Sequence, residues 1–228
     1  MTDFLLSPLF AMPLNLCAFL LGLALYRRTN TALLHPIVGA GLMVAAVLWS
    51  LDIPYDAYRE ASGVLYALLG PAVVALAVPV KQNLTVVRQA GWPLVVTIAV
   101  GALLAPIIAM GIALILGATQ TVLMALTGKS ITTPIAMALA EKIHTAQSLA
   151  AGIAVFTGVV GAVAGPPLLN RLNIRDHRVI GIALGINAHA VGTARALEIS
   201  ALCGAFAALA MGLCGALTAM VLPLLLSS

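Results

Sequence analysis

The sequence predicts an all-α polytopic membrane protein with about six spanning helices and two re-entrant or broken helical elements. Of its 228 residues, 62% are hydrophobic and only 8% are charged, and the mean hydropathy is +1.13. A soluble domain typically contains about 25% charged residues. The apolar runs are long and unbroken, whereas the strands of a membrane β-barrel alternate over roughly ten residues. Composition and run length therefore favour a bundle of membrane helices.

Six apolar segments are each predicted to cross the membrane as a helix. At about 1.5 Å per residue, most are long enough for a hydrocarbon core about 30 Å thick. No basic region or cleavage site accompanies the first of them, so we expect a retained span rather than a signal peptide. The predicted spans are residues 9–25, 33–51, 63–80, 92–118, 146–169 and 203–226.

Two further segments, 119–144 and 178–199, are interrupted by glycine, proline, threonine and charged residues. Of the 11 basic and 7 acidic residues, 13 lie at the N-terminus or in loops, and the other five lie in these segments. Non-helical backbone and charge at membrane depth are tolerated only against protein or a watery cavity. We therefore predict that both segments are re-entrant or broken. The five residues are Lys129, Glu141, Lys142, Arg195 and Glu198.

Loop charge predicts the orientation. Loops 26–32, 81–91 and 170–178 are basic, whereas loop 52–62 is net acidic. The positive-inside rule places the three basic loops in the cytoplasm, which requires segment 119–144 to enter and leave from the outer side. Segment 178–199 would then enter from the cytoplasm, and both termini would lie outside. The net charge of +4 is explained by these cytoplasmic loops, so we expect no nucleic-acid partner.

A weak internal repeat is also present. HPIVGAGLMVA (35–45) and GPAVVALAVP (70–79) resemble TPIAMALAEKI (133–143) and GPPLLNRL (165–172). In the predicted layout three spans separate the two copies, so the copies would be inverted in the membrane, as in many secondary transporters with a midplane site. We expect one membrane domain, with an N-terminal repeat at 1–91 and a C-terminal half at 92–228.

The first polar cluster is GKSITTPIAMALAEKIH (128–144). Pro134 fits the first turn of a helix, so Ser130, Thr132 and Thr133 would surround the helix start, where N–H groups and the dipole favour an anion. Alternatively, Thr132 or Thr133 only caps the helix. For Lys129, and likewise for Glu141 and Lys142, the simpler interpretation is a charge that extends to the membrane interface.

The second polar cluster is GINAHAVGTARALEIS (185–200). His189 and Thr193 would share a helix face, and Gly192 allows close approach of backbones. His189 could bind substrate or transfer a proton near neutral pH; alternatively it only bonds a neighbouring carbonyl. Arg195 could bind a carboxylate through its planar fork, with Glu198 orienting it. Alternatively, Arg195 and Glu198 form a structural ion pair without a ligand.

Other reactive residue types lack a pattern. Cys17, Cys203 and Cys214 have no metal or disulfide spacing and are expected to be buried apolar residues. We predict no role for His35, His144 and His177, and no metal or cofactor. H-E-x-x-H and G-x-S-x-G are absent, and neither cluster offers a nucleophile with its base, so an intramembrane hydrolase is not favoured. We expect a protein that is not an enzyme.

Several of these stretches resemble the LrgB/CidB family over essentially the whole chain. The similar stretches are LLHP, LLGPAVVALAVP, SITTPIAMALA, GAVAGPPLL, AHAVGTARALE and GAFAALAMGLCGALTA. The family's two motif blocks fall on Ser130, Thr132, Thr133 and Pro134, and on His189, Gly192, Thr193, Arg195 and Glu198. Two positions depart from the family pattern: VKQ after LAVP lacks an aromatic residue, and Cys214 stands where a polar amide is common.

The resemblance implies a multi-pass protein of the bacterial inner membrane. Family members are described as antiholin-like proteins or regulators of murein hydrolase export, commonly with a small holin-like partner of the LrgA/CidA type. Others transport small carboxylates such as glycolate, glycerate or pyruvate. The leading hypothesis is a secondary transporter or facilitator of small carboxylates of the pyruvate, glycolate or lactate kind; the alternative is an antiholin-like regulator of lysis. A homo-oligomer is left open.

Overall fold

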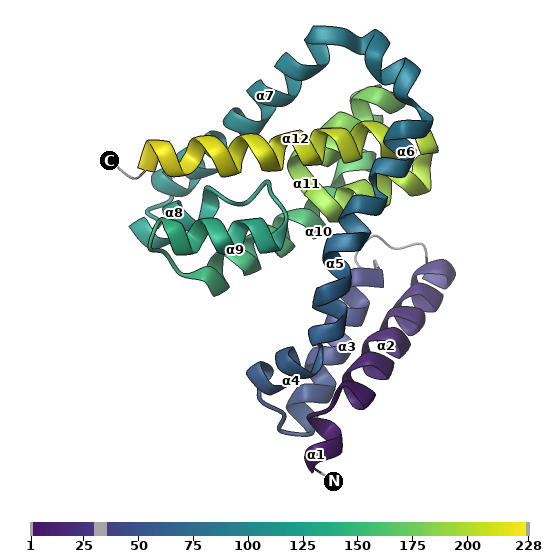
Figure 1. Ribbon diagram of the computed structural model, residues 1–228, viewed down its shortest axis with the longest axis vertical. Helices are drawn as coiled ribbons and strands as arrows, with labels where there is room; N and C mark the ends of the chain where they lie inside the picture. Colours follow the sequence, from purple (N-terminus) through teal and green to yellow (C-terminus); the bar gives the residue numbers. More distant parts are fainter. Residues whose placement is uncertain (1, 30–35, 227–228) are drawn as a thin grey trace. The chain divides into compact units, whose positions relative to one another are not determined.

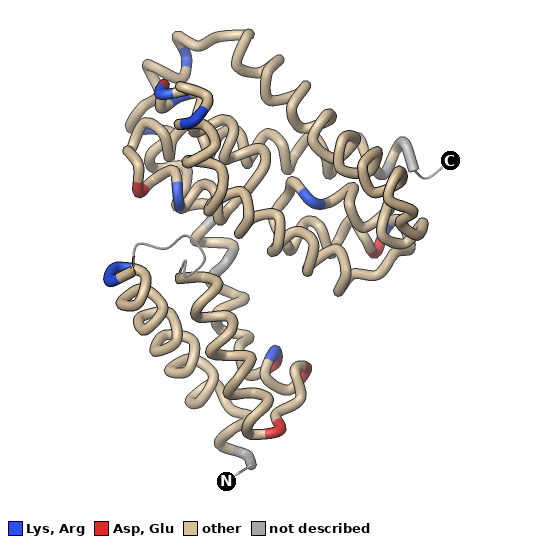
Figure 2. The backbone as a smooth tube through the Cα atoms, turned by 180° about the vertical axis from the view of Figure 1, so that it is seen from behind, with Lys and Arg blue, Asp and Glu red and all other residues tan. Residues whose placement is uncertain are grey.

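The computed structural model describes residues 2–29 and 36–226, and every regular element in them is a helix. The chain divides into two compact units, Met1–Ala75 and Leu76–Ser228. Figure 2 shows the charged positions mainly at turns and helix ends, with long uncharged stretches between them. That distribution is expected of helices that lie in hydrocarbon, because a charge at membrane depth is costly.

The smaller unit is built on the pairing of two helices (Figure 1). A side chain at Gly22 would lie 2.9 Å from the carbonyl oxygen of Pro36, so glycine permits this close approach. The Tyr58 hydroxyl donates to Asn15 Oδ1 at 2.8 Å and connects α4 to α2. The helices of this unit are α1 (Thr2–Leu5), α2 (Pro8–Thr29), α3 (Pro36–Ser50), α4 (Tyr55–Ala61) and α5 (Gly63–Ala75).

The larger unit contains the remaining seven described helices and both predicted polar clusters. Gly91, with φ of 59°, breaks the first part of α7 from the long apolar part that follows. The helices are α6 (Ala77–Gln82), α7 (Leu84–Ile115), α8 (Gln120–Leu126), α9 (Thr133–Lys142), α10 (Gln147–Arg171), α11 (His177–Ile199) and α12 (Ala201–Leu226). α11 and α12 form the interior of this unit, because half of the most apolar stretch of each is buried.

Six described helices are long and apolar enough to cross a membrane, which confirms the predicted class of fold. They are Pro8–Thr29, Gly63–Gln82, Leu84–Ile115, Gln147–Arg171, His177–Ile199 and Ala201–Leu222. Five of them coincide with predicted spans. The sixth, His177–Ile199, qualifies by length and composition, but it is the segment for which the sequence predicts a re-entrant path.

The predicted span 33–51 is helical in its described part. Its described part is α3, of 15 residues, which bends by 119° into α4. Helix α4 lies in segment 52–62, predicted as a loop, and starts directly after Pro54, whose fixed φ suits a helix start. Residues 30–35, which include His35 and the start of the first repeat copy, lie outside the described residues. The inverted repeat therefore stays a prediction.

Segment 120–145 folds into a helical hairpin, which we call the first hairpin. The Thr145 hydroxyl donates to the carbonyl oxygen of Thr121 at 3.4 Å, although the two residues are 24 positions apart. Ala125 of α8 and Ala140 of α9 share one buried cluster with Ala150 of α10. The two arms therefore lie side by side, as Figure 1 also shows, with the turn at residues 127–132 as the tip.

Segment 177–200 forms the second hairpin, because α11 folds back on itself. His177 Nδ1 and Ser200 Oγ are hydrogen-bonded at 2.8 Å, whereas a straight helix would separate residues 23 positions apart by about 34 Å. The reversal occurs at His189, whose φ of 39° and ψ of −124° are not helical. A side chain at Gly192 would lie 2.4 Å from the carbonyl oxygen of Leu184, so the arms are in close contact beside the tip.

The two hairpins open at opposite ends of α10. The open end of the first hairpin lies next to the start of α10 at Gln147. The open end of the second hairpin lies next to the end of α10 at Arg171. Helix α10 has 25 residues and a length of about 38 Å, which is enough to cross the membrane. The chain thus returns along α10 to the side where α7 begins, so the basic segments 81–91 and 170–178 share one side, as the positive-inside argument requires. Segment 81–91, predicted as a loop, is almost entirely helical in α6 and α7.

Candidate functional site

The tips of the two hairpins meet in the interior of the larger unit. Both contact the same turn of α12: the Cys214 thiol donates to the carbonyl oxygen of Ser130 at 3.6 Å, and Thr193 Oγ1 lies 3.8 Å from Met211 Sδ. One buried apolar cluster also includes Ile131 of the first tip and Ile186 beside the second. The fold therefore brings together two segments that the sequence places nearly 60 residues apart.

The first tip buries polar groups. Ser130 is 2% exposed, and its hydroxyl accepts a hydrogen bond of 2.9 Å from Lys129 Nζ. Lys129 is 9% exposed. The expectation that its side chain extends to the membrane interface therefore differs from the structure, because the turn that contains Lys129 is packed inside the unit. Glu141 and Lys142, at the end of α9, are exposed as expected.

Helix α9 begins as the Thr-Thr-Pro sequence predicts. Thr132 is the N-cap residue in an extended conformation, and Thr133 and Pro134 follow in the first turn. The Thr132 side chain makes no capping hydrogen bond. The first N–H groups of a helix have no partner within the helix, so this end keeps donors that a side-chain cap would otherwise occupy. The alternative, a threonine that only caps α9, is thus not the arrangement observed.

The capping difference can be tested on a matched pair of helix starts. Asp176 caps α11 through a hydrogen bond of 2.8 Å from the Arg178 backbone N–H, and Arg178 also donates to it through its guanidinium. We expect Asp176→Ala to lower the free energy of unfolding by about 1 kcal/mol. Thr132→Val should change it by less than about 0.5 kcal/mol, because no cap bond is lost. Denaturant titration of the purified variants measures both; equal losses would contradict the assignment.

The Asp176 bonds also predict a pH dependence. Hydrogen bonds from the Arg178 side chain, and then from its backbone, lower the pKa of Asp176 from 3.8 to about 2. A carboxylate with a lowered pKa stabilises the folded state above its unfolded pKa. This contribution is therefore present above pH 3.8 and is lost as the pH falls towards 2. The difference in stability between wild type and Asp176→Ala should shrink over that interval.

The second tip is centred on His189. The imidazole donates from Nε2 to the carbonyl oxygen of Ala154 on α10 at 2.8 Å, while Nδ1 is buried without a described partner. A side chain at Gly158 would lie 2.6 Å from the imidazole Cε1, so glycine makes room for the ring. The Thr193 hydroxyl donates to the carbonyl oxygen of His189 at 2.8 Å and satisfies the acceptor freed at the reversal. The structure therefore shows the alternative in which His189 bonds a neighbouring carbonyl group. Its Nδ1 atom has no described hydrogen-bond partner.

Arg195 and Glu198 are placed differently from the tip residues. They form an ion pair on the second arm, with 27% and 53% of their side chains exposed. Arg195 lies six residues beyond the reversal, about 9 Å along the arm. The ion pair that the sequence left open is thus present. The Arg195 side chain stays partly accessible in this ion pair, between the tip and the open end of the second hairpin.

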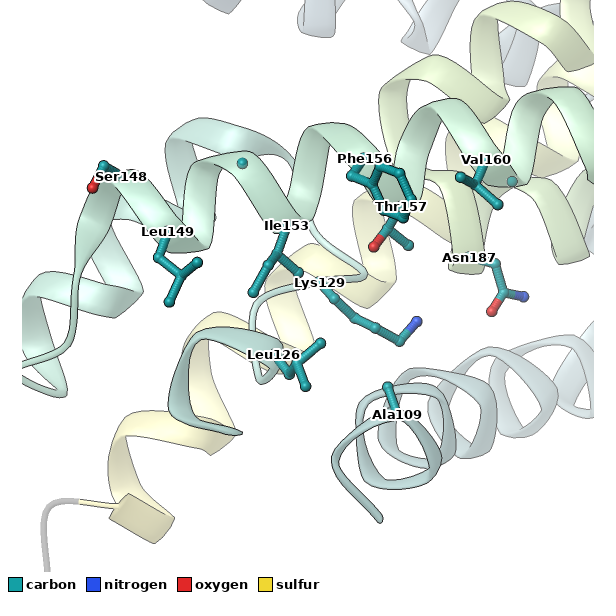
Figure 3. Close-up of a pocket in the computed structure, with 12 residues that line it drawn as sticks. Ala109, Leu126, Lys129, Ser148, Leu149, Ile153, Phe156, Thr157, Val160 and Asn187 are labelled. Atoms are coloured by element: carbon teal, nitrogen blue, oxygen red, sulfur yellow. The ribbon is translucent and has the colours of Figure 1, made fainter. Parts of the chain in front are cut away.

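A pocket of about 630 Å³ lies beside the two tips, between α7, α8, α10 and α11. Figure 3 shows the Lys129 side chain extending into this space, which Ala109, Thr157 and Asn187 border. The walls are mainly apolar, and the polar residues are Lys129, Ser148, Thr157 and Asn187. Its volume lies within the usual range of ligand pockets, about 300–1,000 Å³. We call it the tip pocket.

Lys129 and Asn187 connect the pocket to the two polar clusters. Lys129 donates to Ser130 of the first tip, and Asn187 lies two residues before His189 of the second. The tip therefore joins a cation, an imidazole with one unpaired nitrogen and a helix start with uncapped donors. Such a set can bind an anion and can hold a proton beside it. Among the described residues, no cluster of three or more His, Cys, Asp or Glu side chains could hold a metal ion.

Sequence reasoning missed several residues of this region. Thr157 lies in an apolar run and gave no signal, whereas Asn187, an amide inside a predicted membrane element, could have been singled out. His177, for which no role was predicted, closes the second hairpin through Ser200. Cys203 and Cys214 are buried as predicted, but Cys17 is exposed on α2. An exposed thiol on a membrane helix is compatible with lipid contact, so burial was not required there.

The fold and site define a class: a multi-pass membrane protein in which two hairpins meet between spanning helices. The LrgB-like family model matches residues 15–228, and the chain belongs to this family. It is 32% identical to the YxaC protein of Bacillus subtilis over 83% of this chain and 82% of the relative. It is 30% identical to a Haemophilus influenzae protein over 86% of this chain and 85% of that one.

A relative with a functional name is more distant. The antiholin-like protein LrgB of Bacillus cereus is 22% identical over 96% of both chains. The family is a membrane family and not a known enzyme family. No solved structure matches the chain. The family assignment confirms the resemblance noted in the sequence.

Proposed function

We propose that the chain is a secondary transporter or facilitator of small carboxylates of the pyruvate, glycolate and lactate kind. The observation that supports this most is the meeting of two hairpins that enter from opposite ends of α10. Interrupted helices that meet near the middle of the membrane are the usual construction of substrate sites in secondary transporters. A site reached from both sides by separate hairpins suits alternating access, since either hairpin could shield it from one side.

The proposed substrate-binding residues are those predicted from the sequence. The uncapped start of α9 would donate hydrogen bonds to a carboxylate, and the unpaired His189 nitrogen could accept or release a proton. Arg195, partly exposed beside Glu198, would attract the anion on the side where the second hairpin opens. The set is Ser130, Thr132, Thr133, Pro134, His189, Gly192, Thr193, Arg195 and Glu198. We place the protein in the bacterial inner membrane, acting with a small holin-like partner of the LrgA/CidA type.

The second candidate function is antiholin-like regulation of murein hydrolase export. The name of the Bacillus cereus relative, which aligns over 96% of both chains, supports it. Polar tips buried within the larger unit are more useful to a transporter than to a protein that acts only through contacts with a holin. A lysis phenotype could follow indirectly from altered carboxylate metabolism, so the two functions are separated by measuring transport directly.

Reconstitution into liposomes tests the proposal. We expect the purified protein, alone or with the small partner, to take up labelled pyruvate, glycolate or lactate, while liposomes with the partner alone do not. Uptake should saturate with substrate concentration. If none of the three acids moves and the protein still alters hydrolase release in cells, the regulatory function replaces the transport function.

A further inference from the structure

The tip pocket contains a buried lysine without an acidic partner among the described residues. Lys129 is 9% exposed, and its one hydrogen bond among the described residues goes to the neutral Ser130 hydroxyl. The described residues form two ion pairs, Asp176 with Arg178 and Arg195 with Glu198, and Lys129 belongs to neither. Removing an unpaired ammonium from water costs several kcal/mol. An anion in the pocket would offset that cost.

The rest of the pocket indicates what kind of anion fits. Most of the lining is apolar, and a volume of about 630 Å³ leaves room for an apolar body beside the anionic group. Asn187 donates from Nδ2 to the Ala183 carbonyl oxygen at 3.0 Å, which leaves its Oδ1 as an acceptor at the pocket. The Thr157 hydroxyl faces the same space. These groups can orient a ligand by hydrogen bonds but supply no second positive charge.

We infer that the tip pocket binds a carboxylate with one negative charge and an apolar body, and that Lys129 is the residue that binds its carboxylate group. This inference rests on the proposed transport function and assigns the charge-binding role to a residue outside the predicted set. The ammonium forms a charge-assisted hydrogen bond with the carboxylate, and the apolar walls of α7 and α10 contact the remainder. Arg195 would then attract the carboxylate before it reaches the pocket, nearer the open end of the second hairpin.

The single cation sets a selectivity by charge. Butyrate and succinate both have four carbons, but succinate has a second carboxylate. In the pocket, that second group would lie against apolar walls without a partner, which costs several kcal/mol. We therefore expect butyrate to compete with the transported acid at least about tenfold better than succinate does.

Uptake assays on Lys129 variants test the inference. Phosphatidylcholine liposomes are used so that no anionic lipid competes for the ammonium. Lys129→Gln should raise the KM for labelled pyruvate or lactate by about tenfold to a hundredfold, because a charge-assisted bond is lost. The preference for butyrate over succinate should persist, because the apolar walls still leave the second carboxylate without a partner. Lys129→Arg, which keeps the charge, should stay within about fivefold of wild type.

Lys142→Gln is the matched control, because Lys142 is an exposed lysine on the same hairpin. It should leave KM and selectivity unchanged. If wild type transports but Lys129→Gln keeps its KM, or if succinate competes with the transported acid as well as butyrate does in wild type, the inference is overturned and the transport function stands. A loss of folded protein without a change in KM would likewise overturn it, since Lys129 would then be structural. If wild type moves no carboxylate, the proposed function itself fails.

Discussion

Replacing Gly185 with leucine is expected to prevent stable packing of the second hairpin against α12. An added Cβ alone would lie 2.3 Å from the carbonyl oxygen of Ala207 and 2.9 Å from Ala210 Cβ. Gly181, one turn earlier, is equally close to α12. Small residues four apart allow membrane helices to approach at the backbone. Because the obstacle is backbone rather than a flexible side chain, we expect a loss of about 3 kcal/mol, at the upper end of the usual cost of overpacking.

Titration of the purified protein with sodium dodecyl sulfate, followed by circular dichroism, measures this loss. Gly212→Leu is the matched control, since Gly212 lies on α12 with no atom within 4 Å of an added Cβ. The control should unfold like wild type. Equal midpoints for the two variants would mean that α11 and α12 are not in backbone contact at Gly185.

Arg195→Gln is expected to reduce carboxylate uptake at least about tenfold, while the protein still inserts and folds. The side chain is partly exposed beside the second hairpin, so its fork remains available to an anion. A partly exposed ion pair contributes only about 0.2–1 kcal/mol, and its loss should not unfold the protein. Uptake into liposomes, normalised to inserted protein, gives the result.

Glu198→Gln distinguishes the two interpretations of this pair. If Glu198 orients Arg195 for the substrate, Glu198→Gln should raise KM less than Arg195→Gln does, because the guanidinium remains. If the pair is only structural, both variants should lose the same small amount of stability and transport normally. Unchanged uptake in Arg195→Gln would remove Arg195 from the transport path.

Charge and interruption along the sequence predicted the general layout correctly. Five of the six predicted spans coincide with helices long enough to cross a membrane, and the interrupted segments 119–144 and 178–199 are the two hairpins. The reason is physical: a span in hydrocarbon must be apolar and continuous, whereas glycine, proline and charge are tolerated only where backbone is shielded. Helix α4 and the bend before it were not predicted, because α4 contains the polar residues expected of a loop.

The candidate site was predicted less completely. The N-cap position of Thr132 follows from local chemistry, since proline and threonine have fixed preferences at a helix start. The burial of Lys129 does not, because a lysine near a helix end has the same local sequence whether its turn faces lipid, water or another hairpin. Thr157 was missed for a similar reason: a threonine in an apolar run is ordinary until an opposing helix leaves space beside it.

By itself, the sequence determined that this chain is a helical membrane protein of the LrgB-like family, with its polar residues concentrated in two interrupted segments. Composition and helix length are sufficient for that, because each span must satisfy its own backbone in lipid. Only the tertiary structure decided that the reversal falls at His189, that both tips reach the same turn of α12, and that Lys129 rather than Arg195 borders the pocket. These features depend on contacts between segments that are distant in the sequence. Close approaches of neighbouring helices at Gly158 and Gly185 determine which contacts form, and the local sequence pattern does not encode them.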